Sequence, residues 1–124
     1  MTKVAAVAIG GALGAVLRFY VQNWSLGRWG AIFPYGTLLV NLTGAFLIGI
    51  LMTVFLNHVH IAPAWRLFFV TGILGGYTTF SALTWETFEL FEKGHAMHSL
   101  VYAASSFFGG MISVVAGVFL GRLI

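Results

Sequence analysis

The segment GILGGYTTFSALTWE, residues 72–86, is apolar enough to belong in a membrane, yet it holds three glycines, three threonines, a serine and a carboxylate. Each glycine lowers helix propensity by about 1 kcal/mol relative to alanine, and the threonines add β-branched, hydroxyl-bearing side chains. We therefore predict a helix over roughly 66–92 that is unwound near 75–79, midway along its length. Bare backbone at membrane depth needs cover by protein or by a water-filled cavity.

The composition of the chain excludes a soluble domain. Of 124 residues, 60% are hydrophobic and 7% are charged, and the mean hydropathy is +0.98, whereas soluble domains carry about 25% charged residues. The chain has no cysteine, which excludes disulfides and thiolate metal sites. The six cationic residues are scattered without a basic cluster, so no nucleic-acid partner is expected.

Four apolar runs are long enough to cross a bilayer, which requires about 20 mostly apolar residues. We predict an all-α integral membrane protein of one domain, residues 1–124, with no internal repeat. The first run lacks a convincing small-residue cleavage site, so we expect a retained span rather than a leader. The predicted spans are roughly 3–23, 35–57, 66–92 and 98–122.

Small residues indicate where the helices touch. Lipid provides no hydrophobic drive for helix association, so close backbone approach is a main source of contact. In the fourth span five small residues recur at every fourth position, which places them on one helix face: Ser105, Gly109, Ser113, Gly117 and Gly121. We expect this stripe to pack against another helix, although glycine is also common in membrane helices without such a role.

The cationic residues are balanced between the two sides of the predicted membrane. Three fall on each side: Lys3, Arg66 and Arg122 on one, and Arg18, Arg28 and Lys93 on the other. Cationic bias in short loops sets orientation, so an unbiased chain should insert both ways. Opposite copies can pair about a two-fold axis in the membrane plane. We therefore predict an antiparallel homodimer of dual topology; the alternative is a single orientation in which one side prevails.

Polar side chains within the spans are candidates for an ion pathway. An amide in hydrocarbon is costly unless it is hydrogen-bonded, so Asn41 either joins two helices or offers its donors to a passing anion. The first carboxylate of the chain is Glu86, so little acidic charge is available to hold a cation in transit. Phenylalanine ring edges carry partial positive charge, and Phe80 follows the predicted break, although such a ring can also be plain packing. The other candidate donors are hydroxyls: Thr37, Thr79, Ser81, Thr84, Tyr102, Ser105 and Ser106.

Unwinding of the third span would leave carbonyl oxygens unpaired. Converging carbonyls at a broken helix suit a hard cation such as Na⁺, and two antiparallel copies that cross at their breaks could share one ion. A glycine-packed helix crossing without an ion is the alternative.

Three segments resemble the Fluc/CrcB family of fluoride channels: GGALGAVLRF (10–19), GTLLVNLTGAFLIG (36–49) and the opening segment. The resemblance covers essentially the whole chain. It implies an antiparallel, dual-topology dimer in the cytoplasmic (inner) membrane with two pathways that let F⁻ leave the cell passively, with no enzymatic step.

The resemblance also implies roles for individual residues. Asn41 would donate to fluoride, Phe80 would present its ring edge, and Arg18 would lie near a pathway mouth. Thr79, Ser81, Tyr102 and Ser106 complete the expected pathway. The carbonyls of Gly75 and Thr78 would hold a structural Na⁺ that is not transported.

The chain departs from the family pattern at Leu83, where a second phenylalanine is common. A nearby ring or Ser106 could compensate, or another subunit of a specialised pair could supply the missing ring. Two rival functions remain. A proton-coupled small exporter would use Glu86, because such a carrier needs a titratable carboxylate deep in the bundle. A non-transporting subunit that only packs within a larger complex is the second rival.

Overall fold

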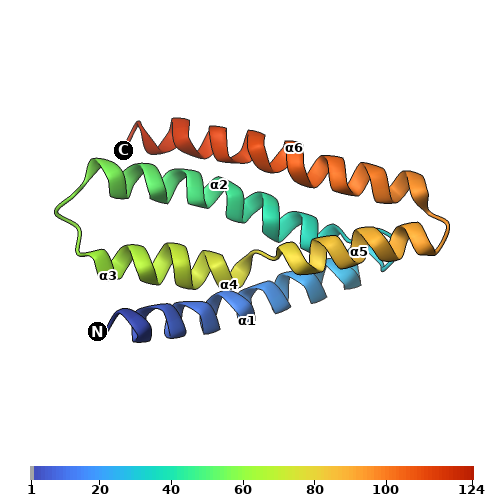
Figure 1. Cartoon of the computed structure of the whole chain (residues 1–124), viewed down its shortest axis with the longest axis horizontal. Helices are drawn as coiled ribbons and strands as arrows, with labels where there is room; N and C mark the ends of the chain where they lie inside the picture. The colour runs from blue at the N-terminus through green and yellow to red at the C-terminus, as the bar shows by residue number, and fades with distance from the viewer. Residues whose placement is uncertain (1) are drawn as a thin grey trace.

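The computed structural model describes residues 2–124, and all of its regular structure over that range is helical (Figure 1). The long helices are α1 (Lys3–Trp29), α2 (Tyr35–Asn57) and α6 (Ala96–Gly121). The third span is assembled from α3 (Pro63–Arg66), the π-helical η1 (Leu67–Leu74), α4 (Gly75–Tyr77) and α5 (Phe80–Glu92). Four helical stretches are therefore long and apolar enough to cross a membrane, which confirms the predicted all-α, four-helix class.

The helix ends fall at recognisable signals. The Thr2 hydroxyl accepts from the backbone N–H of Ala5 and caps the start of α1. Helix α1 ends at Trp29 rather than near residue 23, because the first residue with a left-handed backbone is Gly30, at φ 78°. The polar residues at the end of α1 therefore extend the helix instead of forming a loop.

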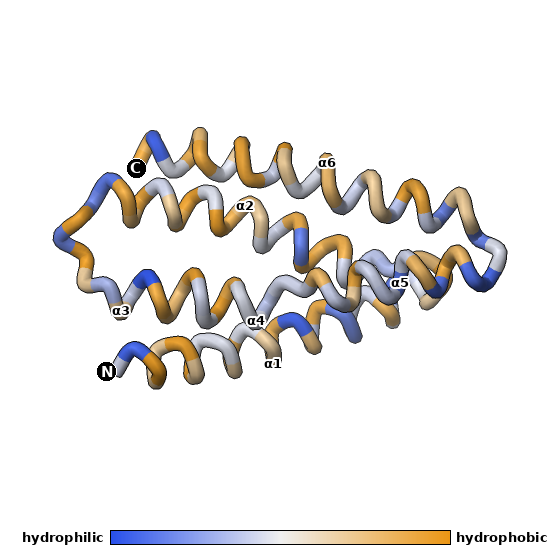
Figure 2. Tube along the Cα trace, in the orientation of Figure 1, coloured by the Kyte–Doolittle hydropathy of each residue, from blue (hydrophilic) through white to orange (hydrophobic). Residues whose placement is uncertain are grey.

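The chain runs back and forth along the bundle, and both termini lie at the same end (Figure 1). The loop between α2 and α3 shares that end, and the α1–α2 and α5–α6 connections lie at the other. Hydrophilic residues gather toward the two ends of the bundle and interrupt the apolar stretch at a few points inside it (Figure 2). This distribution is the one that a bilayer-spanning bundle requires.

Backbone contact at small residues holds the helices together. Helix α2 packs mainly against α6, and α1 packs mainly against η1 and α4. A Cβ atom at Gly117 would overlap the carbonyl oxygen of Phe46, and one at Gly121 would lie 3.0 Å from the Ile50 carbonyl oxygen. A Cβ atom at Gly109 would lie 3.0 Å from a methyl carbon of the Leu42 side chain. The three glycines of the small-residue stripe therefore pack against α2, in agreement with the prediction that this face meets another helix.

The third span contains the π-helical segment η1, which the sequence pattern did not predict. An interruption follows α4 at Thr78 and Thr79, whose backbones are extended, and this confirms the predicted break. The interruption is shorter than predicted, since Gly75 keeps helical dihedral angles and opens α4. Gly76 lies against the carbonyl oxygen of Gly11. The lack of a side chain at Gly76 thus serves close helix contact rather than unwinding.

Candidate functional site

Asn41 holds the backbone at the break. Its Nδ2 donates to the carbonyl oxygen of Thr79 at 3.0 Å, and its Oδ1 accepts from the N–H of Thr79 at 2.8 Å. The N–H of Thr79, which the interruption frees, is thereby paired within the bundle, and the Thr79 carbonyl at the N-cap of α5 gains a hydrogen bond from a second helix. Asn41 thus joins α2 to the third span, which is one of the two roles considered for it from the sequence. Its Nδ2 keeps a second hydrogen that can be donated to another acceptor.

The threonines of the break stop one helix and start the next. The Thr78 hydroxyl donates to the Leu74 carbonyl at 2.9 Å, which already accepts from the Thr78 N–H. The Thr79 hydroxyl accepts from the N–H of Ala82 at 3.2 Å and caps α5. The N–H of Thr79 would reach the Gly75 carbonyl in a continued α-helix, but it is taken by Asn41. The Gly75 carbonyl has therefore lost its α-helical partner.

Arg18 lies at the break and not at a helix end. Its Nη1 donates to the carbonyl oxygen of Thr78 at 3.2 Å. Gly14, one turn earlier on α1, lies against the Ile73 carbonyl oxygen, so the same face of α1 brings the guanidinium to this point. The expectation that Arg18 counts as a charge on one side of the membrane is therefore wrong, because its side chain is held inside the bundle.

When Arg18 is left out of the count, the numbers of cationic residues at the two ends of the bundle are no longer equal. Lys3, Arg66 and Arg122 remain at one end of the bundle, and Arg28 and Lys93 remain at the other. The difference is one charge, so the loops still give only a weak preference for either orientation.

A hydrogen-bonded network ties four helices, α1, α2, α5 and α6, together around Glu86. The Thr37 hydroxyl donates to Glu86 Oε1 at 2.8 Å, and the Tyr102 hydroxyl donates to Oε2 at 2.6 Å. Gln22 Nε2 donates in turn to the Thr37 oxygen at 3.1 Å. Thr37 and Tyr102 are almost completely buried. Each carboxylate oxygen thus accepts a short hydrogen bond, which is how a charged group is accommodated within a membrane protein.

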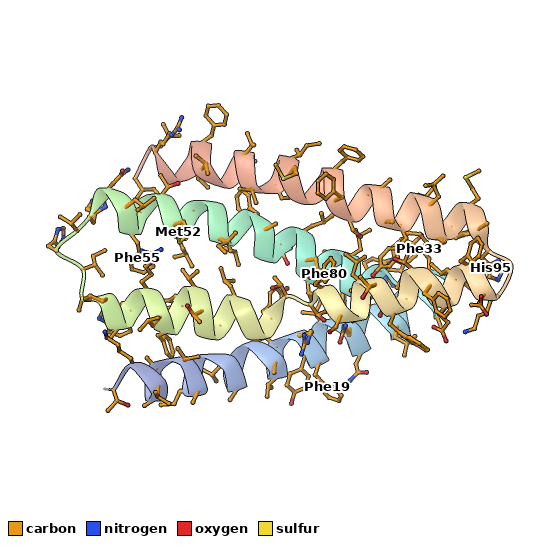
Figure 3. The ribbon with its side chains drawn as sticks, in the orientation of Figure 1. Phe19, Phe33, Met52, Phe55, Phe80 and His95 are labelled. Atoms are coloured by element: carbon orange, nitrogen blue, oxygen red, sulfur yellow. The ribbon has the colours of Figure 1, made fainter. Side chains whose placement is uncertain are left out.

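A cavity of about 490 Å³ opens at the end of the bundle that holds the α1–α2 connection. Its lining includes Thr37 and Glu86, and, farther along α5, Glu89 and Lys93, with His95 beyond them. Phe33 and His95 are visible at this end in Figure 3. The cavity therefore leads from the end of the bundle to the Glu86 network.

A groove of about 730 Å³ runs along α5 and α6 on the far side of the network. Phe80, Leu83 and Ser106 line it, with Ser106 one turn beyond Tyr102 on α6. The Phe80 ring projects from the start of α5 (Figure 3) and is 77% exposed. The Ser106 hydroxyl is buried, and it has no hydrogen-bond partner anywhere in residues 2–124. Most buried polar side-chain atoms are hydrogen-bonded to protein or to ordered water, so this hydroxyl is free to bind a water molecule or a small ligand.

The structure brings most of the predicted residues into three groups, at the break, in the Glu86 network and along the groove. Asn41, Thr79 and Arg18 meet at the break, whereas Tyr102 belongs to the Glu86 network. Phe80 and Ser106 line the groove, and the Ser81 hydroxyl lies 3.4 Å from that of Thr79. Sequence reasoning named Glu86 and Thr37 but did not connect them. The usable signal was Glu86, the first of the three carboxylates of the third span, because a carboxylate within a span requires donors from other spans.

The bundle and its polar interior define a small integral membrane protein of four helices, with an interrupted third span and a network of hydroxyl and amide donors. Comparison with known proteins identifies it further. The model of the CrcB-like protein family, also described as Camphor Resistance (CrcB), matches residues 5–118, and the chain belongs to this family.

Two relatives show how close the similarity is. A protein of Rhizobium meliloti (strain 1021) named "Fluoride-specific ion channel FluC" is 46% identical over 122 residues, which cover 98% of both chains. A protein of the same name from Roseiflexus sp. (strain RS-1) is 46% identical over 119 residues, which cover 96% of this chain and 93% of the relative.

Proposed function

We propose that this protein is a fluoride channel that lets F⁻ leave the cell passively across the cytoplasmic (inner) membrane and so relieves fluoride toxicity. The observation that carries the proposal is the unpartnered Ser106 hydroxyl in a groove that also contains the Phe80 ring. A small anion that has lost its water needs such donors and ring edges. The relatives that match almost the full chain are named fluoride-specific channels.

The polar groups form a series from one end of the bundle toward its middle. An ion would pass from the end cavity along the Glu86 network, where the hydroxyl hydrogens of Thr37 and Tyr102 are donated to the carboxylate, and then reach the unpartnered hydroxyl of Ser106 in the groove. A site with few free donors would bind F⁻ well enough to admit it and weakly enough to release it. No covalent step is needed, and the protein acts as a channel and not as an enzyme.

Asn41 supports the path near the break. One hydrogen of its Nδ2 is used by the Thr79 carbonyl, and the second can donate to an anion that passes the Phe80 ring. Arg18 adds a positive charge at the same depth, and no carboxylate lies within 4.0 Å of its guanidinium in residues 2–124. A fixed, unneutralised cation at this point would favour anions over cations.

A structural Na⁺ fits the carbonyls of the break. The Gly75 carbonyl has lost its α-helical partner, and the Thr78 carbonyl accepts one hydrogen bond, from Arg18, at one of its two lone pairs. Carbonyl oxygens are suitable ligands for a hard cation. Two copies of the chain would supply four such oxygens to one ion, which would stay in place and fix the geometry of the break.

An antiparallel homodimer of dual topology would complete the pathway. The groove on α5 and α6 is open in the single chain, and Phe80 and Phe107 are 77% and 65% exposed. A second copy would close the groove and could place another ring opposite Leu83. The one-charge difference between the two ends supports insertion in both orientations.

The proton-coupled exporter is the second candidate, and the structure gives it less support. Both oxygens of Glu86 accept hydrogen bonds from buried hydroxyls, so the carboxylate is engaged in a fixed contact between helices. An exporter needs that carboxylate to gain and lose a proton in each cycle.

Purified protein in liposomes tests the proposal. The vesicles are loaded with fluoride, the membrane potential is clamped with a potassium ionophore, and a fluoride electrode follows efflux without a pH gradient. A passive channel releases F⁻ under these conditions and excludes Cl⁻. Absence of F⁻ release, or equal release of Cl⁻, contradicts the proposal, whereas efflux that requires a proton gradient supports the exporter.

A further inference from the structure

The end cavity carries a pattern of charge that the pathway itself does not explain. Four of its lining residues can carry charge: Glu86, Glu89, Lys93 and His95. Glu86 lies in the network with its oxygens hydrogen-bonded, so the carboxylate at the rim is Glu89. With histidine neutral, Lys93 is the one cation that lines this cavity among the described residues.

Lys93 and Glu89 form an ion pair at this rim. The Lys93 Nζ lies 3.0 Å from Glu89 Oε1, with a spacing of four residues on α5. Their side chains are 62% and 44% exposed, so both charges reach water as well as the cavity. Such an exposed ion pair adds little to the stability of the fold. Its main effect is on the electrostatic potential at the mouth of the cavity.

A negative rim would slow an anion. A cleft whose walls have a low dielectric constant focuses the field of the charges at its mouth and changes the local concentration of a small ion. Without Lys93, the formal charges that line the cavity are Glu89 and the deeper Glu86, and both are negative. Lys93 cancels the charge nearest to water.

We propose that Lys93 sets the rate at which F⁻ enters the pathway, because it neutralises Glu89 at the mouth of the end cavity. This inference rests on the proposed fluoride channel. Lys93 and Glu89 would affect the entry of F⁻ into the cavity, and they would have no part in the conduction steps deeper in the bundle. The effect is electrostatic, so it must weaken as salt screens the charges.

The experiment compares F⁻ efflux from liposomes for the wild type, Lys93→Gln, Glu89→Gln and the double variant, at about pH 7.5, where histidine is largely neutral. We expect Lys93→Gln to slow efflux roughly threefold to tenfold at an ionic strength of about 0.01 M and less than about twofold at 0.3 M. The double variant should return to within about twofold of the wild type at both salt concentrations. Lys3→Gln removes the same charge at a residue that does not line this cavity and is the matched control, with efflux equal to the wild type.

Each outcome has a distinct meaning. Equal efflux from the wild type and Lys93→Gln at low salt overturns the inference and leaves the proposed function intact. A Lys93→Gln defect that persists at high salt, or that Glu89→Gln does not repair, shows a structural role and also overturns it. A wild type without F⁻ efflux overturns the proposed function and this inference together.

Discussion

Asn41 and Thr79 are joined by two hydrogen bonds, from the amide of one to both backbone groups of the other, at 3.0 and 2.8 Å. The pair lies where a helix stops within a membrane span, and Asn41 Oδ1 replaces the partner that a continued helix would give to the N–H of Thr79. An unsatisfied backbone group at that depth costs several kcal/mol. The break can therefore persist only while the amide is in place.

Asn41→Asp replaces the Nδ2 donor with an oxygen that faces the Thr79 carbonyl. We expect F⁻ efflux to fall at least tenfold, because a donor is lost and a negative charge enters the anion path, as measured with the fluoride electrode. Asn57→Asp, at the exposed end of α2, introduces the same charge and should conduct normally. Normal efflux from Asn41→Asp would contradict the role given to the amide.

Tyr102→Phe removes the hydroxyl that donates to Glu86 at 2.6 Å. We expect the free energy of unfolding in detergent to fall by about 1 kcal/mol, within the range measured for hydrogen bonds in membrane bundles. Efflux should also slow several-fold, since the Glu86 charge is then less neutralised. Tyr20→Phe is the control, because Tyr20 is 65% exposed on α1. A slower channel with unchanged stability would place Tyr102 in the pathway but not in the support of the fold.

Ser106→Ala separates a binding role from a structural role. The hydroxyl has no partner within residues 2–124, so its loss breaks no internal bond and should not lower the unfolding temperature. Efflux should slow because F⁻ loses a donor. Ser113→Ala, two turns later on α6 and outside the groove lining, should leave efflux unchanged. Unaltered efflux from Ser106→Ala would remove the observation that carries the proposed function.

Gly117→Ala tests the contact between α2 and α6. The added Cβ would overlap the Phe46 carbonyl oxygen and lie 3.1 Å from the Ile50 nitrogen. Since both neighbours are backbone atoms, we expect a loss of about 1–3 kcal/mol in the free energy of unfolding. Gly110→Ala meets no atom within 4 Å and should be neutral or stabilising by up to about 1 kcal/mol. Thermal unfolding in detergent compares the two variants. Equal unfolding temperatures would show that α2 can move away from α6 to make room for the added methyl group.

Replacement of Na⁺ by a large organic cation tests the proposed ion at the break. An ion that binds only the folded protein stabilises it by about 2.7 kcal/mol at one hundred times its dissociation constant. We expect a lower unfolding temperature without Na⁺ at constant ionic strength, restored when Na⁺ is returned. The same measurement on Asn41→Asp, whose break should be distorted, should show a smaller dependence on Na⁺. Identical unfolding with either cation would contradict a bound Na⁺.

The architecture was predictable because it depends on local pattern. Apolar runs predict the four helices, small residues at every fourth position predict a packing face on α6, and the glycine- and threonine-rich segment predicts the break. The limits of the break were less predictable. Gly75 is compatible both with an unwound segment and with a helix, and the packing of α1 against α4 favours the helix.

The connections of the site were not predictable, because they join residues far apart in the chain. Nothing in the local pattern shows that Thr37 and Tyr102 meet Glu86, or that Arg18 reaches the Thr78 carbonyl. The π-helical segment was missed for a different reason. Its sequence is an ordinary apolar run, and its wider turn is a rare alternative to the α-helix that is not recognisable from composition.

The π-helical segment Leu67–Leu74 makes the third span sensitive to the deletion of single residues. An α-helix rotates by about 100° per residue, so deletion of one residue here would swing every later side chain of the span around the helix axis relative to α1. The break would then point away from Asn41 and Arg18 although each residue remained in the chain. The π-helical segment thus determines how the break is rotated about the helix axis relative to Asn41 and Arg18. Single-residue deletions along the third span, assayed for fluoride efflux, should show a loss that composition alone would not explain.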